Sequence, residues 1–226
     1  MTRGAHLATL GDGRIATWGG QASGRTGAAL DPATGAWRTF AHPAMSGTMV
    51  TVRGSLVASA ELSPIVGTDG SLDRLHGVVL DVDSGRTIPF AREVAGSFRN
   101  SSVLHLDRSF LGYVATDALH LFALGSRTWR GVAQPFVTNE PSDITIHDVG
   151  AGQWLFEGTS RGTFVLEPSV GKFCSLPMPD ELRVQAAVYV SPRFRVALGG
   201  AMMVDRSPRH APTREEDPRA QIVRLR

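Results

Sequence analysis

A spacing that occurs four times constrains the fold of this chain more than any other feature. In the first copy, Leu30 is followed by Gly35 at an offset of five residues and by Trp37 at an offset of seven. The other copies keep parts of this pattern, as Leu80 with Gly85, Phe122 with Trp129, and Leu166 with Gly171. A fixed offset that returns at intervals of tens of residues predicts a repeated supersecondary unit.

The most complete unit is residues 5–40, which read as four short strands joined by turns. Apolar runs at 5–10, 15–18, 27–30 and 36–40 are rich in residues that favour strands. Gly11 and Gly13 bound one tight turn. The segment from Asp31 to Gly35 has the chemistry of another, because Pro presets φ and Gly permits a positive φ.

This order of strands and turns resembles a kelch repeat, which forms one blade of a β-propeller. The matching residues are Gly19, Gly20, Asp31, Gly35 and Trp37, and Leu30 stands where an aromatic residue is usual. The resemblance implies an all-β fold. It also leads us to expect Trp37 and Trp129 to be buried core residues.

First strands begin near residues 5, 48, 102, 144 and 186, so the resemblance extends over nearly the whole chain. It implies a single kelch-like, five-bladed β-propeller domain over residues 1–226, with blades at about 4–43, 46–92, 101–135, 143–178 and 184–226. The fifth copy has strand patterns only at 186–190, 194–198 and 220–225. Either the last blade is three-stranded, or a neighbouring molecule completes it at its open edge, giving a homo-oligomer. A β-sandwich is the main alternative fold, but it leaves the seven-residue recurrence unexplained.

Composition excludes several classes of protein. One cysteine, Cys174, allows no internal disulfide and no cysteine-rich metal site. The formal net charge is +2, Lys172 is the only lysine, and the arginines are scattered, so we expect no nucleic-acid partner. No apolar run approaches the roughly 20 residues of a membrane helix, and the first residues do not resemble a signal peptide. We therefore expect a cytoplasmic protein without a membrane partner.

Long loops are predicted on one side of the propeller. Loops between second and third strands lie on the same side as the connections between blades, whereas the opposite side has only tight turns. The expected loops are residues 21–26, 61–76, 158–162 and 205–219, and the expected connections are 41–47, 92–101, 134–143 and 177–184. Because propellers bind ligands at the channel mouth, we place the site on this loop-rich side and expect residues 205–219 to act as a lid or a disordered loop.

Candidate site residues are the polar and aromatic side chains next to this side. The ligand-binding candidates are Trp18, Asn100, Ser102, Asn139, Glu140 and Gln185. The catalytic candidates are Glu61, Asp143 and Glu157, because two carboxylates facing each other across a funnel can serve as acid and base. The alternative for each residue is that it caps a turn by bonding backbone amides.

We expect no metal and no cofactor. Five histidines, His42, His76, His105, His120 and His147, follow no ligand spacing, so structural roles are favoured for them. No phosphate-binding loop or nucleophile elbow is present.

Three functions remain open. The first is binding of a small molecule or short peptide in the funnel. The second is an enzyme on the same frame that performs acid–base chemistry such as cyclisation, isomerisation or glycan cleavage, in the manner of bacterial secondary metabolism. The third is a scaffold for protein interaction. Two carboxylates, or a histidine and a carboxylate, that converge within about 5–9 Å in the funnel would favour the enzyme. A funnel lined only by aromatic and amide side chains would favour binding, and a broad exposed apolar patch would favour the scaffold.

Overall fold

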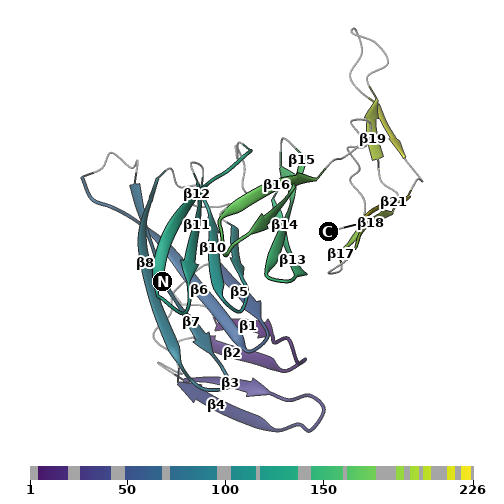
Figure 1. The fold of residues 1–226 in the computed structure, drawn as a ribbon. Helices are drawn as coiled ribbons and strands as arrows, with labels where there is room; N and C mark the ends of the chain where they lie inside the picture. Colours follow the sequence, from purple (N-terminus) through teal and green to yellow (C-terminus); the bar gives the residue numbers. More distant parts are fainter. Residues whose placement is uncertain are drawn as a thin grey trace. The chain divides into compact units, whose positions relative to one another are not determined.

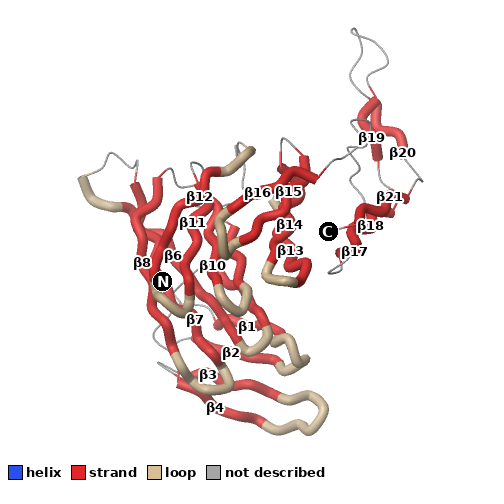
Figure 2. The backbone as a smooth tube through the Cα atoms, viewed as in Figure 1, coloured by secondary structure: helices blue, strands red, loops and turns tan. Residues whose placement is uncertain are grey.

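The structure is a computed structural model of all 226 residues. It describes residues 5–19, 26–41, 49–67, 72–95, 103–115, 118–136, 144–159, 162–176, 187–190, 194–198, 201–204, 213–216 and 220–224. These residues form strands and turns and no helix (Figure 2), which confirms the all-β prediction. The chain divides into two compact units, Met1–Ile144 and Thr145–Arg226.

The first unit contains three four-stranded antiparallel sheets, each with its strands in chain order (Figure 1). The first sheet consists of β1 (Ala5–Thr9), β2 (Ile15–Gly19), β3 (Thr26–Leu30) and β4 (Trp37–Ala41). The second sheet consists of β5 (Met49–Arg53), β6 (Leu56–Pro64), β7 (Leu72–Asp81) and β8 (Thr87–Ala95). The third sheet consists of β9 (Val103–Leu106), β10 (Phe110–Val114), β11 (Ala118–Ala123) and β12 (Thr128–Ala133).

The second unit contains a fourth such sheet and a group of shorter strands. The fourth sheet consists of β13 (Thr145–Gly150), β14 (Gln153–Thr159), β15 (Gly162–Glu167) and β16 (Lys172–Leu176). A three-stranded sheet follows, in the order β17 (Ala187–Val190), β18 (Phe194–Leu198) and β21 (Ala220–Arg224). Between β18 and β21 in the chain, β19 (Ala201–Val204) pairs with β20 (Thr213–Glu216). Residues 205–219, which were expected to be a loop throughout, therefore include a strand.

The recurrent turn between third and fourth strands has a physical cause. In three copies a glycine with φ near 70° donates its N–H to the carbonyl oxygen four residues earlier, at 2.8 Å. These glycines are Gly35, Gly85 and Gly171. The copy in the third sheet makes the same bond from Arg127, which has a φ of 58°. Because only glycine adopts a positive φ without steric cost, this turn keeps a glycine in three of the four sheets.

A second recurrent pair joins a glycine in the third strand to a phenylalanine in the fourth. Gly27 lies opposite Phe40, and Gly77 lies opposite Phe90. A Cβ on either glycine would lie within 3 Å of the partner's ring. The phenylalanine ring therefore covers the space left by the missing side chain, which explains why Phe40 and Phe90 share an offset in the sequence.

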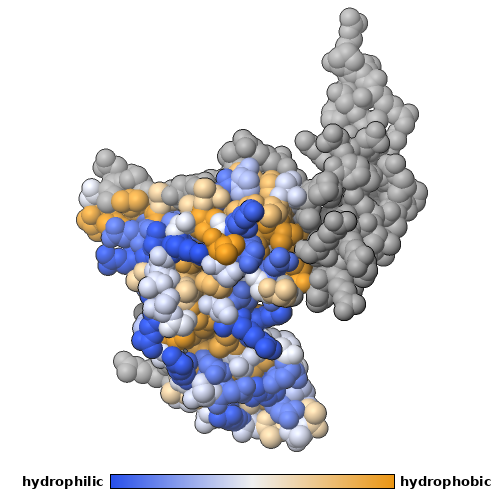
Figure 3. Space-filling view, in the orientation of Figure 1, coloured by the Kyte–Doolittle hydropathy of each residue, from blue (hydrophilic) through white to orange (hydrophobic). Residues whose placement is uncertain are grey.

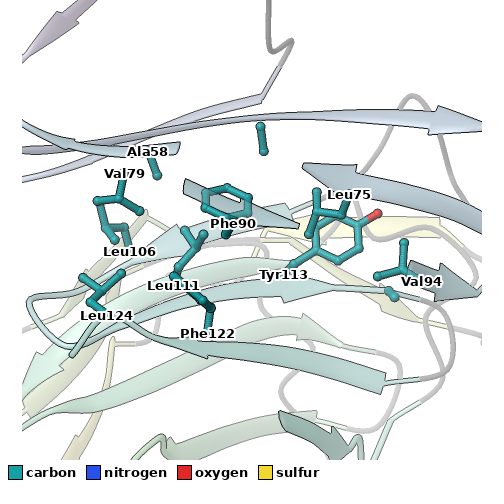
Figure 4. Packing of buried hydrophobic residues seen from close by; sticks show 12 residues of the cluster. Ala58, Leu75, Val79, Phe90, Val94, Leu106, Leu111, Tyr113, Phe122 and Leu124 are labelled. Atoms are coloured by element: carbon teal, nitrogen blue, oxygen red, sulfur yellow. The ribbon is translucent and has the colours of Figure 1, made fainter. Parts of the chain in front are cut away.

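Within the first unit, the second sheet packs face to face on the first, and the third sheet packs in the same way on the second. Leu80 of the second sheet is buried in a cluster with Trp18 and Ala29 of the first. Phe122 of the third sheet is buried in a cluster with Phe90 and Val79 of the second. Figure 4 shows the second of these clusters, with Phe90 and Leu75 facing Leu111 and Tyr113. The third-strand residue that precedes the recurrent turn is Leu80 in the second sheet and Phe122 in the third. In both sheets its side chain points toward the preceding sheet in the chain.

Trp37 corrects one expectation. Its side chain is 63% exposed, so the prediction of a buried core residue is wrong, whereas Trp129 is half-buried against Phe90 and Phe122. Trp37 lies opposite Leu30 on the face of the first sheet that points away from the second. Leu7, which shares this face, is 73% exposed.

The second sheet is longer than expected. Residues 61–76 were expected to form a loop, but β6 extends to Pro64 and β7 begins at Leu72. Likewise β8 continues to Ala95, into residues 92–101 that were expected to connect two blades. The extension is stabilised because Leu75 and Val94 bury their side chains in the cluster that the second and third sheets share.

Polar contacts join the first two sheets at the tight-turn end. The N–H of Gly11 donates to the carbonyl of Gly54 at 2.9 Å. Arg14 bridges Asp12 and Asp83, each with a closest N–O distance of 2.7 Å. The hydrogen bonds to Asp83 and then Asp12 raise the pKa of Arg14, and the backbone N–H of Arg14 leads the interactions that lower the pKa of Asp12. These contacts keep charged groups at the end opposite to the long loops.

Candidate functional site

In three of the four-stranded sheets, a histidine lies next to another polar or aromatic side chain in the half of the sheet nearer the loop between second and third strands. In the first sheet this end contains His6 and Trp18, paired across β1 and β2. In the second it contains Glu61 and His76, paired across β6 and β7. In the fourth it contains His147, together with Glu157.

His147 and Glu157 form the closest pair of ionisable groups among the candidates. Nε2 of His147 lies 3.2 Å from Oε2 of Glu157. The Glu157 side chain is 11% exposed and that of His147 is 31% exposed. They come from β13 and β14, the first two strands of their sheet, and Glu157 lies opposite Thr145 at the start of β13. A buried carboxylate that holds a more exposed imidazole is an arrangement that can orient a general base or acid.

Trp18 lies in the core between the first and second sheets. It is 2% exposed and stacks on His6 with ring centroids 5.6 Å apart and planes inclined by 18°. Its Nε1 is buried and has no hydrogen-bond partner among the residues that the structure describes. The indole therefore offers a buried donor at this end of the sheet rather than a freely exposed ring.

Glu61 is half-buried at a cross-strand position beside His76. Both side chains lie on the same face of the sheet as Val57 and Leu80, which pack toward the first sheet. Glu61 and Glu157 belong to different units, so the proposed acid–base relationship between them stays a prediction. Within its own unit, Glu157 has a histidine partner instead.

The remaining candidates lie outside the described residues. These are Asn100, Ser102, Asn139, Glu140, Asp143 and Gln185, together with His42 among the histidines. Their roles as ligand-binding or catalytic residues stay predictions.

Sequence reasoning missed a polar group between the second and third sheets. Arg92 donates from Nε to Nδ1 of His120 at 2.8 Å, and the Arg92 guanidinium lies 5.8 Å from the centroid of the Trp129 ring. Asp73 is fully buried two residues before Leu75 on the same face of β7. The available signal was the period of two that places Ile88, Phe90 and Val94 at alternate positions of 87–95, which is typical of a strand rather than a loop. Residues 72–80 show no such alternation.

Two properties of the described residues bear on the class of site. No group of three or more His, Cys, Asp or Glu side chains in this part of the chain is arranged to hold a metal ion. The strands and turns that the structure describes include no helix long and apolar enough to cross a membrane. Figure 3 shows hydrophilic and hydrophobic residues interspersed on the face of the described residues that it presents.

Comparison with known proteins adds no family. Neither a protein-family model nor a curated protein sequence matches this chain. We therefore infer function from the geometry of the chain's own residues.

Proposed function

We propose that the chain is a kelch-like, five-bladed β-propeller that binds a small molecule or short peptide at the loop-rich end of its sheets. The observation that carries this proposal is the shared direction of packing in the first three sheets, where the residue at one offset in the third strand faces the preceding sheet. Repetition of this relationship turns successive sheets about a common axis, as in a propeller.

Ring closure makes a specific demand on the first sheet. The face that carries Leu7 and Trp37 would have to pack against the last sheet, which has three strands. Burial of these apolar side chains would contribute free energy to closure. If the face instead stays exposed in solution, it favours the third function, a scaffold for protein interaction.

Thiol reactivity tests closure. Cys174 is exposed and is first replaced by Ser. Leu7→Cys then reports on the face in question, and Val66→Cys, at a position 98% exposed in the turn between β6 and β7, serves as the matched control. A closed ring predicts that a maleimide reagent labels Leu7→Cys much more slowly than Val66→Cys. Equal labelling rates would contradict the closed propeller.

Acid–base catalysis is the second candidate function, and the contact between His147 and Glu157 favours it. The imidazole would transfer a proton to or from the substrate, and Glu157 would orient the ring and stabilise its protonated form. The reaction would need no metal or cofactor. Binding alone requires the two side chains only as hydrogen-bonding groups.

One ligand screen tests binding and separates it from catalysis. Saturation-transfer NMR of the whole protein is run with mixtures of amino acids, dipeptides, monosaccharides and nucleosides. Binding at the proposed end predicts that Glu157→Gln weakens a hit, whereas Glu93→Gln, a change on the exposed outer strand β8, does not. Consumption of a hit that stops in His147→Gln while binding persists would support the enzyme. Absence of any hit, or equal binding by both variants, would contradict the proposed site.

Among the described residues, β21 has a neighbour on one side only, and this edge of the three-stranded sheet suggests a partner. β21 ends this sheet, and a strand from a second copy of the chain would complete four strands. Light scattering during gel filtration tests this: a dimer that Ile222→Pro converts to monomer would support it, and a monomer at all concentrations would contradict it.

A further inference from the structure

We infer that β4, the edge strand of the first sheet, pairs antiparallel with β4 of a second copy of the chain and forms a symmetric dimer. Among the strands that the structure describes, β4 pairs with β3 alone, and it lies at the edge of its sheet in Figure 1. The interface uses the first unit only. It depends neither on ring closure nor on the edge at β21.

The main chain of β4 has three residues whose hydrogen-bonding groups point away from β3. The N–H of Asp31 donates to the carbonyl oxygen of Ala36 at 2.9 Å, so the main chain of Ala36 points toward β3. This direction alternates along an antiparallel strand. The N–H and C=O groups of Trp37, Thr39 and Ala41 therefore point to the open edge. An added strand would satisfy them.

The other two sheets of the first unit have residues that disfavour an added strand at the same place of their edge strands. Thr39 lies four residues after the turn residue with positive φ, and the same count leads to Pro89 in β8 and Gly131 in β12. At this place the main chain points to the open edge, so Pro89 leaves that edge without a donor. Gly131 weakens β12 as a template, because glycine has no side chain to pack. β4 has neither residue, and its register with β3 runs without a bulge.

The charged side chain of β4 does not block the open edge. Charged side chains often keep edge strands from pairing. Arg38 instead donates from an Nη to the carbonyl oxygen of Asp83 at 2.7 Å, in the turn between β7 and β8. It thus lies on the face of the first sheet that packs on the second. The side chains of Trp37, Thr39 and Ala41, on the other face, are exposed and uncharged.

The sequence of β4 is complementary to itself when two copies pair about Thr39. In this register Thr39 lies opposite Thr39 of the second copy, and Trp37 lies opposite Ala41 of the second copy. Residues opposite each other with outward main-chain groups exchange two hydrogen bonds. The large indole lies beside a small methyl group, and Arg38 lies opposite Phe40 of the second copy, so no like charges meet. A two-fold axis at Thr39 closes the contact at a dimer.

A charge exchange at Thr39 tests this pairing on the whole protein, with sedimentation velocity at micromolar to millimolar concentrations. We expect the unaltered chain to form a dimer. Thr39→Lys and Thr39→Glu each place two like charges opposite one another at the two-fold axis, so each variant alone should be monomeric. A mixture of the two variants places lysine opposite glutamate and should restore a dimer. An unrelated peptide on this edge would not produce this rescue.

Thr39→Pro tests the hydrogen bonds at the same position. It introduces the residue that the second sheet has at this place, so the first sheet should tolerate it. It removes two hydrogen bonds from the interface and should raise the dimer dissociation constant about tenfold or more. Thr39→Val, which keeps the N–H and the preference for a strand, is the matched control and should leave the constant unchanged. Ile222→Pro, at β21, should leave it unchanged as well.

Cross-linking tests the register even if a variant at Thr39 folds poorly. In a chain with Cys174→Ser, Thr39→Cys should form a disulfide-linked dimer on mild oxidation, because opposite Cα atoms in such a pair lie about 5.5 Å apart. Val66→Cys, at an exposed position in the turn between β6 and β7, should link much more slowly. Equal rates, a monomer at all concentrations, a mixture of charged variants that stays monomeric, or a dimer that survives Thr39→Pro would overturn the proposal. A dimer lost only in Ile222→Pro would assign the interface to β21 instead.

Discussion

Nε2 of His147 and Oε2 of Glu157 lie 3.2 Å apart on adjacent antiparallel strands, although ten residues separate them in the sequence. This contact places a histidine beside a catalytic candidate that the sequence had singled out only by its position. The two side chains should therefore be energetically coupled. Their coupling can be measured without knowledge of a ligand.

A double-mutant cycle with His147→Ala and Glu157→Gln measures this coupling. Each single change should lower the free energy of unfolding by about 1–3 kcal/mol, because it removes the partner of a largely buried polar group. The double variant should lose less than the sum, with a coupling energy of at least about 0.5 kcal/mol in urea denaturation. Additive losses would mean that the contact contributes nothing to the folded state.

Gly77→Ala should be severely destabilising. The added Cβ would lie 2.1 Å from the carbonyl oxygen of Ser59 and 2.7 Å from the Phe90 ring, and a backbone oxygen in a central strand cannot move away. We expect a loss of about 3 kcal/mol or more in the free energy of unfolding. Gly125→Ala is the control, since no atom lies within 4 Å of its Cβ position, and its effect should stay within about 1 kcal/mol. Similar unfolding midpoints for the two variants would show that Phe90 does not pack over Gly77.

Arg127→Gly should stabilise the protein. Arg127 has a φ of 58° in the turn where three other sheets have a glycine. Removing the Cβ relieves about 1–2 kcal/mol of left-handed strain in the folded state. The greater freedom of glycine in the unfolded chain destabilises the fold by about 0.5–1 kcal/mol. A net gain of roughly 0.5–1 kcal/mol is expected by thermal denaturation. Gly35→Ala makes the opposite change in the first sheet and should destabilise.

Trp129→Ala should lower the free energy of unfolding by about 3 kcal/mol, as is usual for a large aromatic side chain in a core. The indole packs against both Phe122 and Phe90, and the Arg92 guanidinium lies over it. Trp129→Phe retains part of this packing and should cost less. A loss below about 1 kcal/mol for the alanine variant would exclude Trp129 from the core of the first unit.

Stability should fall in acid through aspartates whose pKa is lowered by folding. For Asp81, burial raises the pKa, but hydrogen bonds from Ser84 and Ser55 outweigh it, so the pKa of this carboxyl is lower than its usual value. The unfolded chain then binds more protons, so this stability is present above about pH 4, the ordinary Asp value, and is lost as pH falls through the lower folded value. Asp31 acts in the same direction, because hydrogen bonds from Thr34 and then from the N–H of Ala33 lower its pKa. In urea titrations from pH 6 to pH 2, Asp81→Asn should flatten the dependence, whereas Glu93→Gln on the exposed edge should not.

The local structure could be predicted from the residues alone. Glycine adopts a positive φ without steric cost, as Gly35, Gly85 and Gly171 do here. Their common offset therefore predicted the turns and the strands on either side of them. Four of the expected strand groups occur as four-stranded antiparallel sheets in chain order. Hydrogen bonding between neighbouring strands in the chain follows from short turns, and this is why composition and spacing were sufficient at this level.

Which side chains are buried, and which of them are in contact, depends on how the sheets pack and could not be predicted from spacing. Trp37 and Trp129 occupy the same offset, yet one is 63% exposed and the other packs against two phenylalanines. Trp129 lies on the face of the third sheet that packs against the second, whereas Trp37 lies on the face of the first sheet that points away from the second. Arg92 and His120 likewise lie 28 residues apart and meet only where two sheets pack face to face. Spacing along one strand governs the face on which a side chain lies, but the partner across an interface depends on which sheets pack together.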